Sequence, residues 1–177
     1  MSEWMKMKLL LTGPPQVGKT TIIKRFCKQA RAEGIPIKGF YTEEIREGGK
    51  RVGFKLVTLD GQEVVFSHVR FYSPFKVGKY KVDIKALEAV LPSILPSHAE
   101  LIVIDEIGKM ECFSERFKQT VWKILHAPNP FLGTIALKGR GFIEKVKQLK
   151  QVEIIEVNLE NRDSLPEFLL RKLQFNE

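Results

Sequence analysis

Short apolar runs in this sequence alternate with longer segments whose apolar residues recur every three or four positions. The runs predict strands over residues 6–11, 39–45, 52–59, 63–69, 100–105, 131–137 and 152–157. The longer segments predict a helix from about Lys19 to Gly34 and helices over residues 84–91, 115–126 and 142–150. Ser164 to Glu167 has the capping-box spacing with an early proline, which predicts the start of a last helix.

A helix separates most of these strands, and a connection of this kind returns the chain in the same direction. This order is typical of an α/β fold, in which helices cover both faces of a mostly parallel sheet. Residues 39–82 are the exception, because Gly48-Gly49 and Asp60-Gly61 separate strand-like runs with no helix between them. We predict β-hairpins in this region, inserted in the parallel core or extending it. Residues 1–177 are expected to form a single domain.

Length and composition agree with a self-supporting globular domain. The chain has 177 residues, of which 44% are hydrophobic. Its longest aliphatic runs, such as residues 101–104, are far shorter than the roughly 20 residues that cross a bilayer. The N-terminus lacks the apolar core of a signal peptide, so we expect a cytoplasmic protein with no membrane association. The cysteines and histidines have no disulfide or zinc spacing; they are Cys27, Cys112, His68, His98 and His126.

The strongest chemical signal is the segment Gly13-Pro-Pro-Gln-Val-Gly-Lys-Thr20, which fits G-x-x-x-x-G-K-[ST] between a predicted strand and a predicted helix. Such a loop turns its backbone N–H groups toward phosphate oxygens, and the helix N-terminus adds partial positive charge. Lys19 is expected to reach the β and γ phosphates, and the Thr20 hydroxyl to ligate Mg²⁺. The candidate nucleotide-binding residues are Gly13, Pro14, Pro15, Gln16, Val17, Gly18, Lys19, Thr20 and Thr21.

A second signal is the pair of carboxylates that ends the apolar strand at residues 100–105. In an open α/β sheet the first acid emerges at the edge where ligands bind, so Asp105 is expected to hold Mg²⁺ directly or through water. Glu106 points to another side of the chain and is the candidate base for the attacking water, which makes Glu106 and Lys19 the catalytic candidates. Asp105 to Gly108 also fits D-x-x-G, but no N-K-x-D follows, so no guanine specificity is inferred.

Hydrolysis of a triphosphate also calls for a cation at the γ phosphate. Several basic residues could supply this charge, and the sequence does not choose among them. The candidates are Lys109, Lys138, Arg140, Arg46 and Arg51. The net charge of +8 is compatible with nucleotides, nucleic acid or acidic proteins as partners, and it selects none of these.

Three segments together resemble the small nucleoside-triphosphatase family first described in thermophiles, whose animal members are called cancer-related nucleoside-triphosphatases. They are residues 13–21, the block Gly39-Phe-Tyr-Thr-Glu-Glu-Ile-Arg46 followed by residues 51–54, and Asp105-Glu-Ile-Gly-Lys-Met-Glu111. The resemblance implies a P-loop domain with a RecA-like or AAA-like core that hydrolyses ATP, GTP, CTP and UTP with Mg²⁺ and little base preference. This sequence departs from the family pattern at Gln16, where many members have glycine. No role for residues 39–54 follows from chemistry.

Two other functions stay open at this point. A P-loop kinase would transfer the γ phosphate to a small acceptor, and the hairpin region with Arg46, Lys50 and Arg51 could serve as its basic lid. Glu106 beside Asp105 fits water activation better.

A nucleotide-dependent switch or nucleic-acid-binding module is the other alternative. It is suggested by the net charge and by the segment 70–76, in which three aromatic residues lie near Arg70 and Lys76. The aromatic residues are Phe71, Tyr72 and Phe75, and such residues are more often ordinary strand packing. Nucleic acid is therefore a possible partner but not a favoured one. The oligomeric state does not follow from the sequence.

Overall fold

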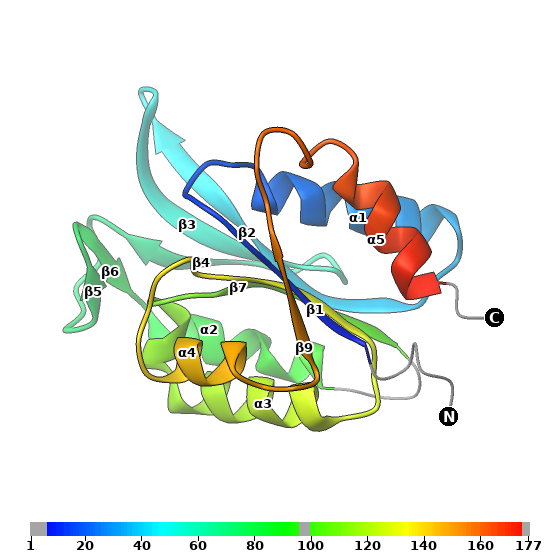
Figure 1. The fold of residues 1–177 in the computed structure, drawn as a ribbon. Helices are drawn as coiled ribbons and strands as arrows, with labels where there is room; N and C mark the ends of the chain where they lie inside the picture. The colour runs from blue at the N-terminus through cyan, green and yellow to red at the C-terminus, as the bar shows by residue number, and fades with distance from the viewer. Residues whose placement is uncertain (1–6, 96–99, 175–177) are drawn as a thin grey trace.

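The computed structural model describes residues 7–95 and 100–174, so the predictions for residues 1–6 and for His98 lie outside the described residues. The strands of this part of the chain form one sheet in the order β5-β6-β4-β3-β2-β7-β8-β1-β9 (Figure 1). Their bounds are Lys8–Thr12 (β1), Ile37–Glu47 (β2), Lys50–Thr58 (β3), Glu63–His68 (β4), Lys76–Val77 (β5), Tyr80–Val82 (β6), Leu101–Ile107 (β7), Phe131–Ile135 (β8) and Val152–Glu156 (β9).

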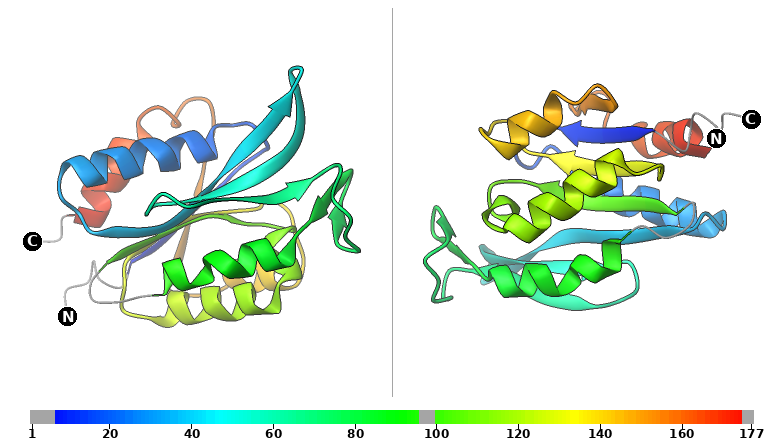
Figure 2. Two further views of the ribbon diagram at one scale, coloured as in Figure 1. Left: turned by 180° about the vertical axis from the view of Figure 1, so that it is seen from behind. Right: turned by 90° about the horizontal axis from the view of Figure 1, so that it is seen from below.

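Two layers of helices cover the sheet. The α-helices of the described residues are Lys19–Ala32 (α1), Ile84–Val90 (α2), Glu115–His126 (α3), Phe142–Lys147 (α4) and Leu165–Gln174 (α5), and two short 3₁₀ helices span Leu91–Ile94 (η2) and Glu111–Phe113 (η3). Helices α1 and α5 lie together on one face, and α2, α3 and α4 lie on the other (Figures 1 and 2). The predicted α/β fold with helices on both faces is confirmed.

The sheet is more mixed than the prediction of a mostly parallel sheet. Strands β2, β7, β8, β1 and β9 pair in parallel, whereas β3, β4, β6 and β5 continue the same sheet through antiparallel pairs. The β-rich region at residues 39–82 therefore extends the parallel core and does not form a separate insertion. Strands β5 and β6 were not predicted, because segments of two and three residues carry no readable alternation.

The central strands are buried on both faces, which explains their nearly continuous apolar sequences. Every residue of β1 and β8 is buried. One core cluster lies between the sheet and α1 and α5, and it includes the apolar stripe of α1 at Ile22, Ile23 and Phe26. The other lies between the sheet and α2, α3 and α4. This packing places the C-terminal ends of β1 and β7 on either side of β8.

Two details of the helices differ from the predictions. Ser164 Oγ donates to the Asn161 carbonyl and Glu167 pairs with Arg171, so the predicted capping box at the start of α5 does not form. Helix α4 ends at Lys147, three residues before the predicted end at residue 150. Within residues 7–95 and 100–174, no helix combines the length and the apolarity needed to span a bilayer.

Candidate nucleotide-binding and catalytic site

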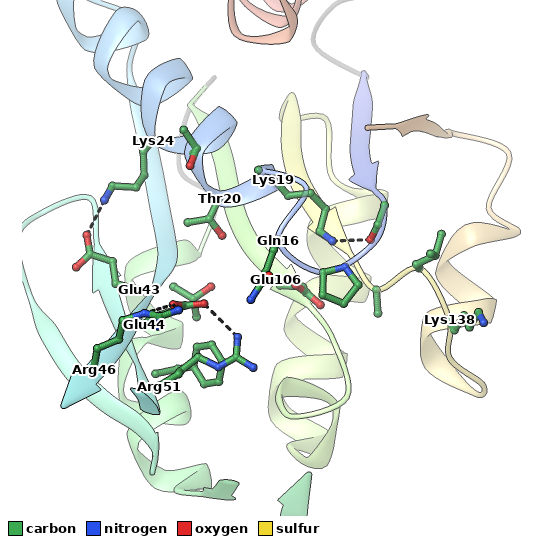
Figure 3. Close-up of a pocket in the computed structure, with 18 residues that line it drawn as sticks. Gln16, Lys19, Thr20, Lys24, Glu43, Glu44, Arg46, Arg51, Glu106 and Lys138 are labelled. Carbon is green, nitrogen blue, oxygen red and sulfur yellow. Dashed lines mark hydrogen bonds and ion pairs between the residues drawn. The ribbon is translucent and has the colours of Figure 1, made fainter. Parts of the chain in front are cut away.

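A cleft of about 1010 Å³ opens at the C-terminal ends of β1, β7 and β8, where open α/β sheets bind ligands. One wall is the loop that leads into α1, and the opposite wall is the hairpin of β2 and β3 (Figure 3). Both predicted catalytic residues, Lys19 and Glu106, line this cleft. The predicted nucleotide-binding residues that line it are Gly13, Pro15, Gln16, Gly18, Lys19, Thr20 and Thr21. Pro14 and Val17 do not, and the Val17 side chain is buried in the core.

The glycines of the loop meet two different demands. Gly13 has φ +155°, and a Cβ at this position would lie 2.9 Å from the Val157 carbonyl oxygen, so the loop can pass this close to the end of β9 only with glycine. Gly18 has φ +111° and immediately precedes α1. It offers no side chain to cap the helix, and the first turn of α1 contains no acidic residue. The N–H groups of this turn therefore face the cleft without a competing acceptor, as an anion site requires.

Lys19 is held by its own loop. Its Nζ donates to the Gly13 carbonyl at 2.7 Å and to the Pro14 carbonyl at 3.4 Å (Figure 3). These acceptors are neutral, so phosphate oxygens can replace them with stronger charge-assisted hydrogen bonds. The lysine is thus positioned at the mouth of the loop before any ligand arrives.

Gln16 has an unusual backbone conformation. Its φ is +65°, and it has the one positive φ of a non-glycine residue among those described. Glycine adopts this left-handed conformation without steric cost, whereas glutamine at this position carries a backbone strain. The exposed Gln16 side chain lines the cleft beside Glu106 (Figure 3).

Asp105 does not itself line the cleft: it is 1% exposed and bonds to Thr20 and Thr42, which do line it. Its Oδ2 accepts hydrogen bonds from Thr20 Oγ1 at 2.8 Å and from the amide and hydroxyl of Thr42 at 3.4 and 3.3 Å. Its Oδ1 accepts one from Thr134 Oγ1 at 2.6 Å. Burial raises the pKa of Asp105 above its ordinary value, and the hydrogen bonds from the three threonines oppose this rise because they stabilise the carboxylate.

The oxygens of Thr20 and Asp105 fit a magnesium site. Mg²⁺ commonly takes one or two protein oxygens together with water and substrate phosphates, and it rarely occupies an all-protein cage. The two predicted metal ligands lie 2.8 Å apart at the phosphate end of the cleft. Among the described residues, no group of three or more His, Cys, Asp or Glu side chains could hold a metal by itself. The chemistry of these donors therefore fits an ion that arrives with the phosphates.

Glu106 is the carboxylate that faces the open part of the cleft. Burial, and next the negative charge of Asp105, raise its pKa to about 6, and the positive charge of Lys19 opposes this rise. Glu111 is 5% exposed, and its carboxylate lies close to that of Glu106, beside Gly108. A Cβ at Gly108 would lie 2.7 Å from Glu106 Oε1 and 3.0 Å from Glu111 Oε1, so only glycine leaves room for both carboxylates. Burial, and next the charge of Glu106, raise the pKa of Glu111 well above its ordinary value.

The segment from Gly39 to Arg46, which had no predicted role, forms most of β2 and supplies residues to this site. Gly39 has φ +138°, and a Cβ there would lie 1.8 Å from the Val103 carbonyl oxygen, so glycine lets β2 pack closely on β7. This close approach brings Thr42 to Asp105. Further along β2, Glu43 pairs with Lys24 of α1 at 2.8 Å, and Glu44 pairs with the arginines of the hairpin.

The five candidate cations lie in different surroundings. Arg46, Arg51 and Lys138 line the cleft. Lys109 lies instead in an adjoining pocket of about 240 Å³ that also contains Glu106 and Glu111. Arg140 is exposed and lines neither space.

The aromatic and basic segment at residues 70–76 does not form a stacking surface. Phe71 packs on His68 with ring centroids 5.7 Å apart, and Phe75 packs on Phe113 at 5.4 Å. Arg70 pairs with Glu47. Tyr72 is fully exposed, but a single ring does not provide a path for successive bases.

Sequence reasoning missed Thr42, Thr134 and Glu111. Thr42 and Thr134 lie on the two strands that flank β7, so their contacts with Asp105 depend on strand order, which no local pattern reveals. Glu111 was visible within the segment that carries the family resemblance. Its burial depends on the turn of η3 back against β7.

A scan against models of protein families matches residues 8–170 to the model described as NTPase. This match covers the phosphate loop, both acids after β7 and all strands of the sheet. The chain belongs to this family. The resemblance inferred from the sequence is therefore confirmed.

Two curated relatives match over nearly their whole lengths. The nucleoside-triphosphatase THEP1 of Thermotoga sp. (strain RQ2) is 44% identical over 173 residues, which cover 96% of this chain and 97% of the relative. The human cancer-related nucleoside-triphosphatase is 40% identical over 177 residues, which cover 91% and 93%. The crystal structure of THEP1 from the hyperthermophile Aquifex aeolicus superimposes with a TM-score of 0.84 at 35% identity and covers 96% of this chain and 100% of that structure.

Proposed function

We propose that this protein hydrolyses nucleoside triphosphates to diphosphate and phosphate, with Mg²⁺ and little preference for the base. The observation that carries the proposal is the convergence of Lys19, the Thr20–Asp105 pair and Glu106 on one cleft. Relatives that match nearly the whole chain are named nucleoside-triphosphatases, which supports the same activity.

The loop and the start of α1 bind the triphosphate. The N–H groups of the first turn donate to phosphate oxygens, and Lys19 exchanges the Gly13 and Pro14 carbonyls for the β and γ phosphates. Thr20 and Asp105 would hold Mg²⁺ beside these phosphates. When bound, the ion neutralises part of the charge on the β and γ oxygens.

Glu106 acts as the general base. A water oxygen attacks the γ phosphorus, the bond from this phosphorus to the β–γ bridging oxygen breaks, and a water proton moves to the Glu106 carboxylate. The position of Glu106 supports this role. Its carboxylate lines the cleft, whereas the Asp105 carboxylate is hydrogen-bonded to the threonine cluster of Thr20, Thr42 and Thr134. With a pKa of about 6, Glu106 is ionised at neutral pH and basic enough to accept the proton.

Little base preference is proposed for two reasons. No N-K-x-D element occurs in the sequence. The groups argued above to bind the nucleotide all address phosphates or the metal ion, which are common to the four nucleotides.

The test is phosphate release from ATP, GTP, CTP and UTP with and without Mg²⁺, for the parent protein and for Glu106→Gln. The parent is expected to release phosphate from all four nucleotides only with Mg²⁺. Glu106→Gln should reduce kcat by about 10²-fold or more while the affinity for the nucleotide stays within about threefold. Lys19→Ala should lose both binding and turnover. Formation of the nucleoside diphosphate together with a phosphorylated hydroxyl acceptor, in place of free phosphate, would instead identify a kinase. An unchanged kcat in Glu106→Gln would remove the base from its role.

A further inference from the structure

The cations on the hairpin side of the cleft differ in how many of their donors are already used. Lys24 pairs with Glu43 at 2.8 Å. All three guanidinium nitrogens of Arg46 are engaged: Nε and NH2 contact Glu44 Oε2 at 2.9 and 2.7 Å, and NH1 donates to the Gly49 carbonyl at 3.0 Å. Both side chains are therefore already paired with an acid, and every guanidinium nitrogen of Arg46 has a partner.

Arg51 is fixed in place and keeps one end free. Its Nε donates to Tyr80 Oη at 2.9 Å, and its NH1 donates to Glu44 Oε1 at 3.1 Å. The guanidinium carbon lies 5.0 Å from the ring centroid of Phe54 and 5.4 Å from that of Tyr80. NH2 contacts no hydrogen-bond acceptor among the described residues. In Figure 3 the guanidinium group reaches from the hairpin toward Gln16 and Glu106.

The charges around Glu44 leave Arg51 partly uncompensated. One carboxylate serves two guanidinium groups, so the group of Glu44, Arg46 and Arg51 retains one positive charge at the edge of the cleft. The aromatic rings and Tyr80 restrict the arginine before a ligand binds, which reduces the ordering cost of each new hydrogen bond. Lys138 also lines the cleft, but it is exposed and has no comparable support.

We propose that Arg51 is the cation, supplied by the same chain, that contacts the terminal phosphoryl group and stabilises the charge that develops on it during hydrolysis. Arg51 is thus a catalytic residue and Tyr80 its positioning residue. This inference rests on the proposed function, because it assigns a partner to the γ phosphate of the same substrate. It also assigns a role to the hairpin part of the segment that resembles the family.

The first measurement compares the affinity for the non-hydrolysable β,γ-imido analogue of ATP with the affinity for ADP, in the presence of Mg²⁺. Only the analogue offers a terminal phosphoryl group. Arg51→Ala and Arg51→Lys should each lower the ratio of the two affinities by about 10-fold, because a charge-assisted hydrogen bond is lost or its fork geometry is broken. ADP affinity should change by less than about threefold. Lys50→Ala removes a charge from the same hairpin at an exposed residue that does not line the cleft, and it should leave the ratio unchanged.

The second measurement is turnover of ATP. Arg51→Ala should lower kcat on the order of 10³-fold, the reach of an arginine at the transferred phosphoryl group, and added guanidinium ion should restore part of it. Tyr80→Phe keeps the ring and removes the hydroxyl, so it should lower kcat about 10-fold with little change in KM and without rescue by guanidinium. Lys50→Ala should stay within about threefold of the parent.

The two proposals fail in different ways. A parent protein that releases no phosphate would refute the proposed function, yet the affinity ratio would still decide whether Arg51 contacts the terminal phosphoryl group. An unchanged ratio in both Arg51 variants would overturn the inference. So would a loss of turnover in Lys138→Ala together with normal turnover in Arg51→Ala.

Discussion

Thr134→Val tests how the threonine cluster prepares Asp105 for a metal ion. Asp105 Oδ1 accepts its one hydrogen bond within the described residues from Thr134 Oγ1, at 2.6 Å, whereas the other bonds go to Oδ2. Valine has nearly the shape of threonine but no hydroxyl group. The substitution therefore leaves one oxygen of a carboxylate that is 1% exposed without a partner and changes little else.

The size of the effect follows from the burial and the charge of the acceptor. A hydrogen bond to a buried charged group contributes about 1.5–3 kcal/mol, and its loss raises the pKa of the acceptor because the carboxylate is less stabilised. Residues that orient a metal ligand typically change metal affinity by about 10–100-fold when they are replaced. We therefore expect Thr134→Val to raise the Mg²⁺ concentration for half-maximal activity by about 10–100-fold and to lower the free energy of unfolding by about 1.5–3 kcal/mol.

The assay is phosphate release from saturating ATP across a Mg²⁺ titration, with urea unfolding of the same proteins. Two variants serve as controls. Thr134→Ser keeps the hydroxyl and should resemble the parent. Thr12→Val removes a buried threonine hydroxyl on the neighbouring β1, where Oγ1 donates to the Ile135 carbonyl at 2.9 Å. It should cost about 1 kcal/mol of stability and leave the Mg²⁺ requirement unchanged.

The reasoning is refuted if Thr134→Val needs no more Mg²⁺ than Thr12→Val does. That result would mean that Asp105 does not depend on its threonine partners to bind the ion. Equal losses of stability in the two variants would show that Asp105 Oδ1 is satisfied in another way.

Two further predictions concern Lys8 and Gln16. Burial lowers the pKa of Lys8, which is 2% exposed, from 10.5 to about 8, so the unfolded chain binds more protons between these values and stability from this residue rises with pH across that window. Relative to Lys8→Met, the parent should gain on the order of 2 kcal/mol of unfolding free energy between about pH 7.5 and 9.5, measured by urea denaturation; parallel profiles would contradict this. Gln16→Gly should keep kcat/KM within about threefold, whereas Gln16→Val should be less stable than Gln16→Gly by at least about 1 kcal/mol, because a β-branched residue resists a φ of +65°. Equal thermal unfolding of these two variants would show that the loop tolerates either conformation.

Most of the fold could be predicted from local patterns. The helix from residue 115 to residue 126 was predicted with its observed bounds, and α1 was predicted from its start at Lys19. These segments have strong periodicity and clear boundary residues, which are properties of the chain itself. The order of the strands was not predictable in this way, because β2 lies next to β7 and β8 lies between β7 and β1 only after the layers pack.

The residues of the candidate site also fall into two groups, those that a local motif predicts and those that only the structure reveals. Lys19, Thr20, Asp105 and Glu106 were found because each belongs to a short motif at the end of a predicted strand. Thr134 has no motif, and its contact with Asp105 spans 29 residues of sequence. Among the candidate cations, sequence could not distinguish Arg46 from Arg51, since both flank the same turn.

The sequence by itself determined the phosphate loop, the paired acids, the α/β class and the family of this protein. These properties depend on residues that are close together in the chain, where steric and hydrogen-bonding rules act locally. The tertiary structure decided which side chains surround Asp105 and that the hairpin forms a wall of the cleft. It also decided that every guanidinium nitrogen of Arg46 has a partner, whereas NH2 of Arg51 has none within residues 7–95 and 100–174. Such contacts depend on strand order and on close approaches such as that of Gly39 to Val103, which arise only when the whole sheet is assembled.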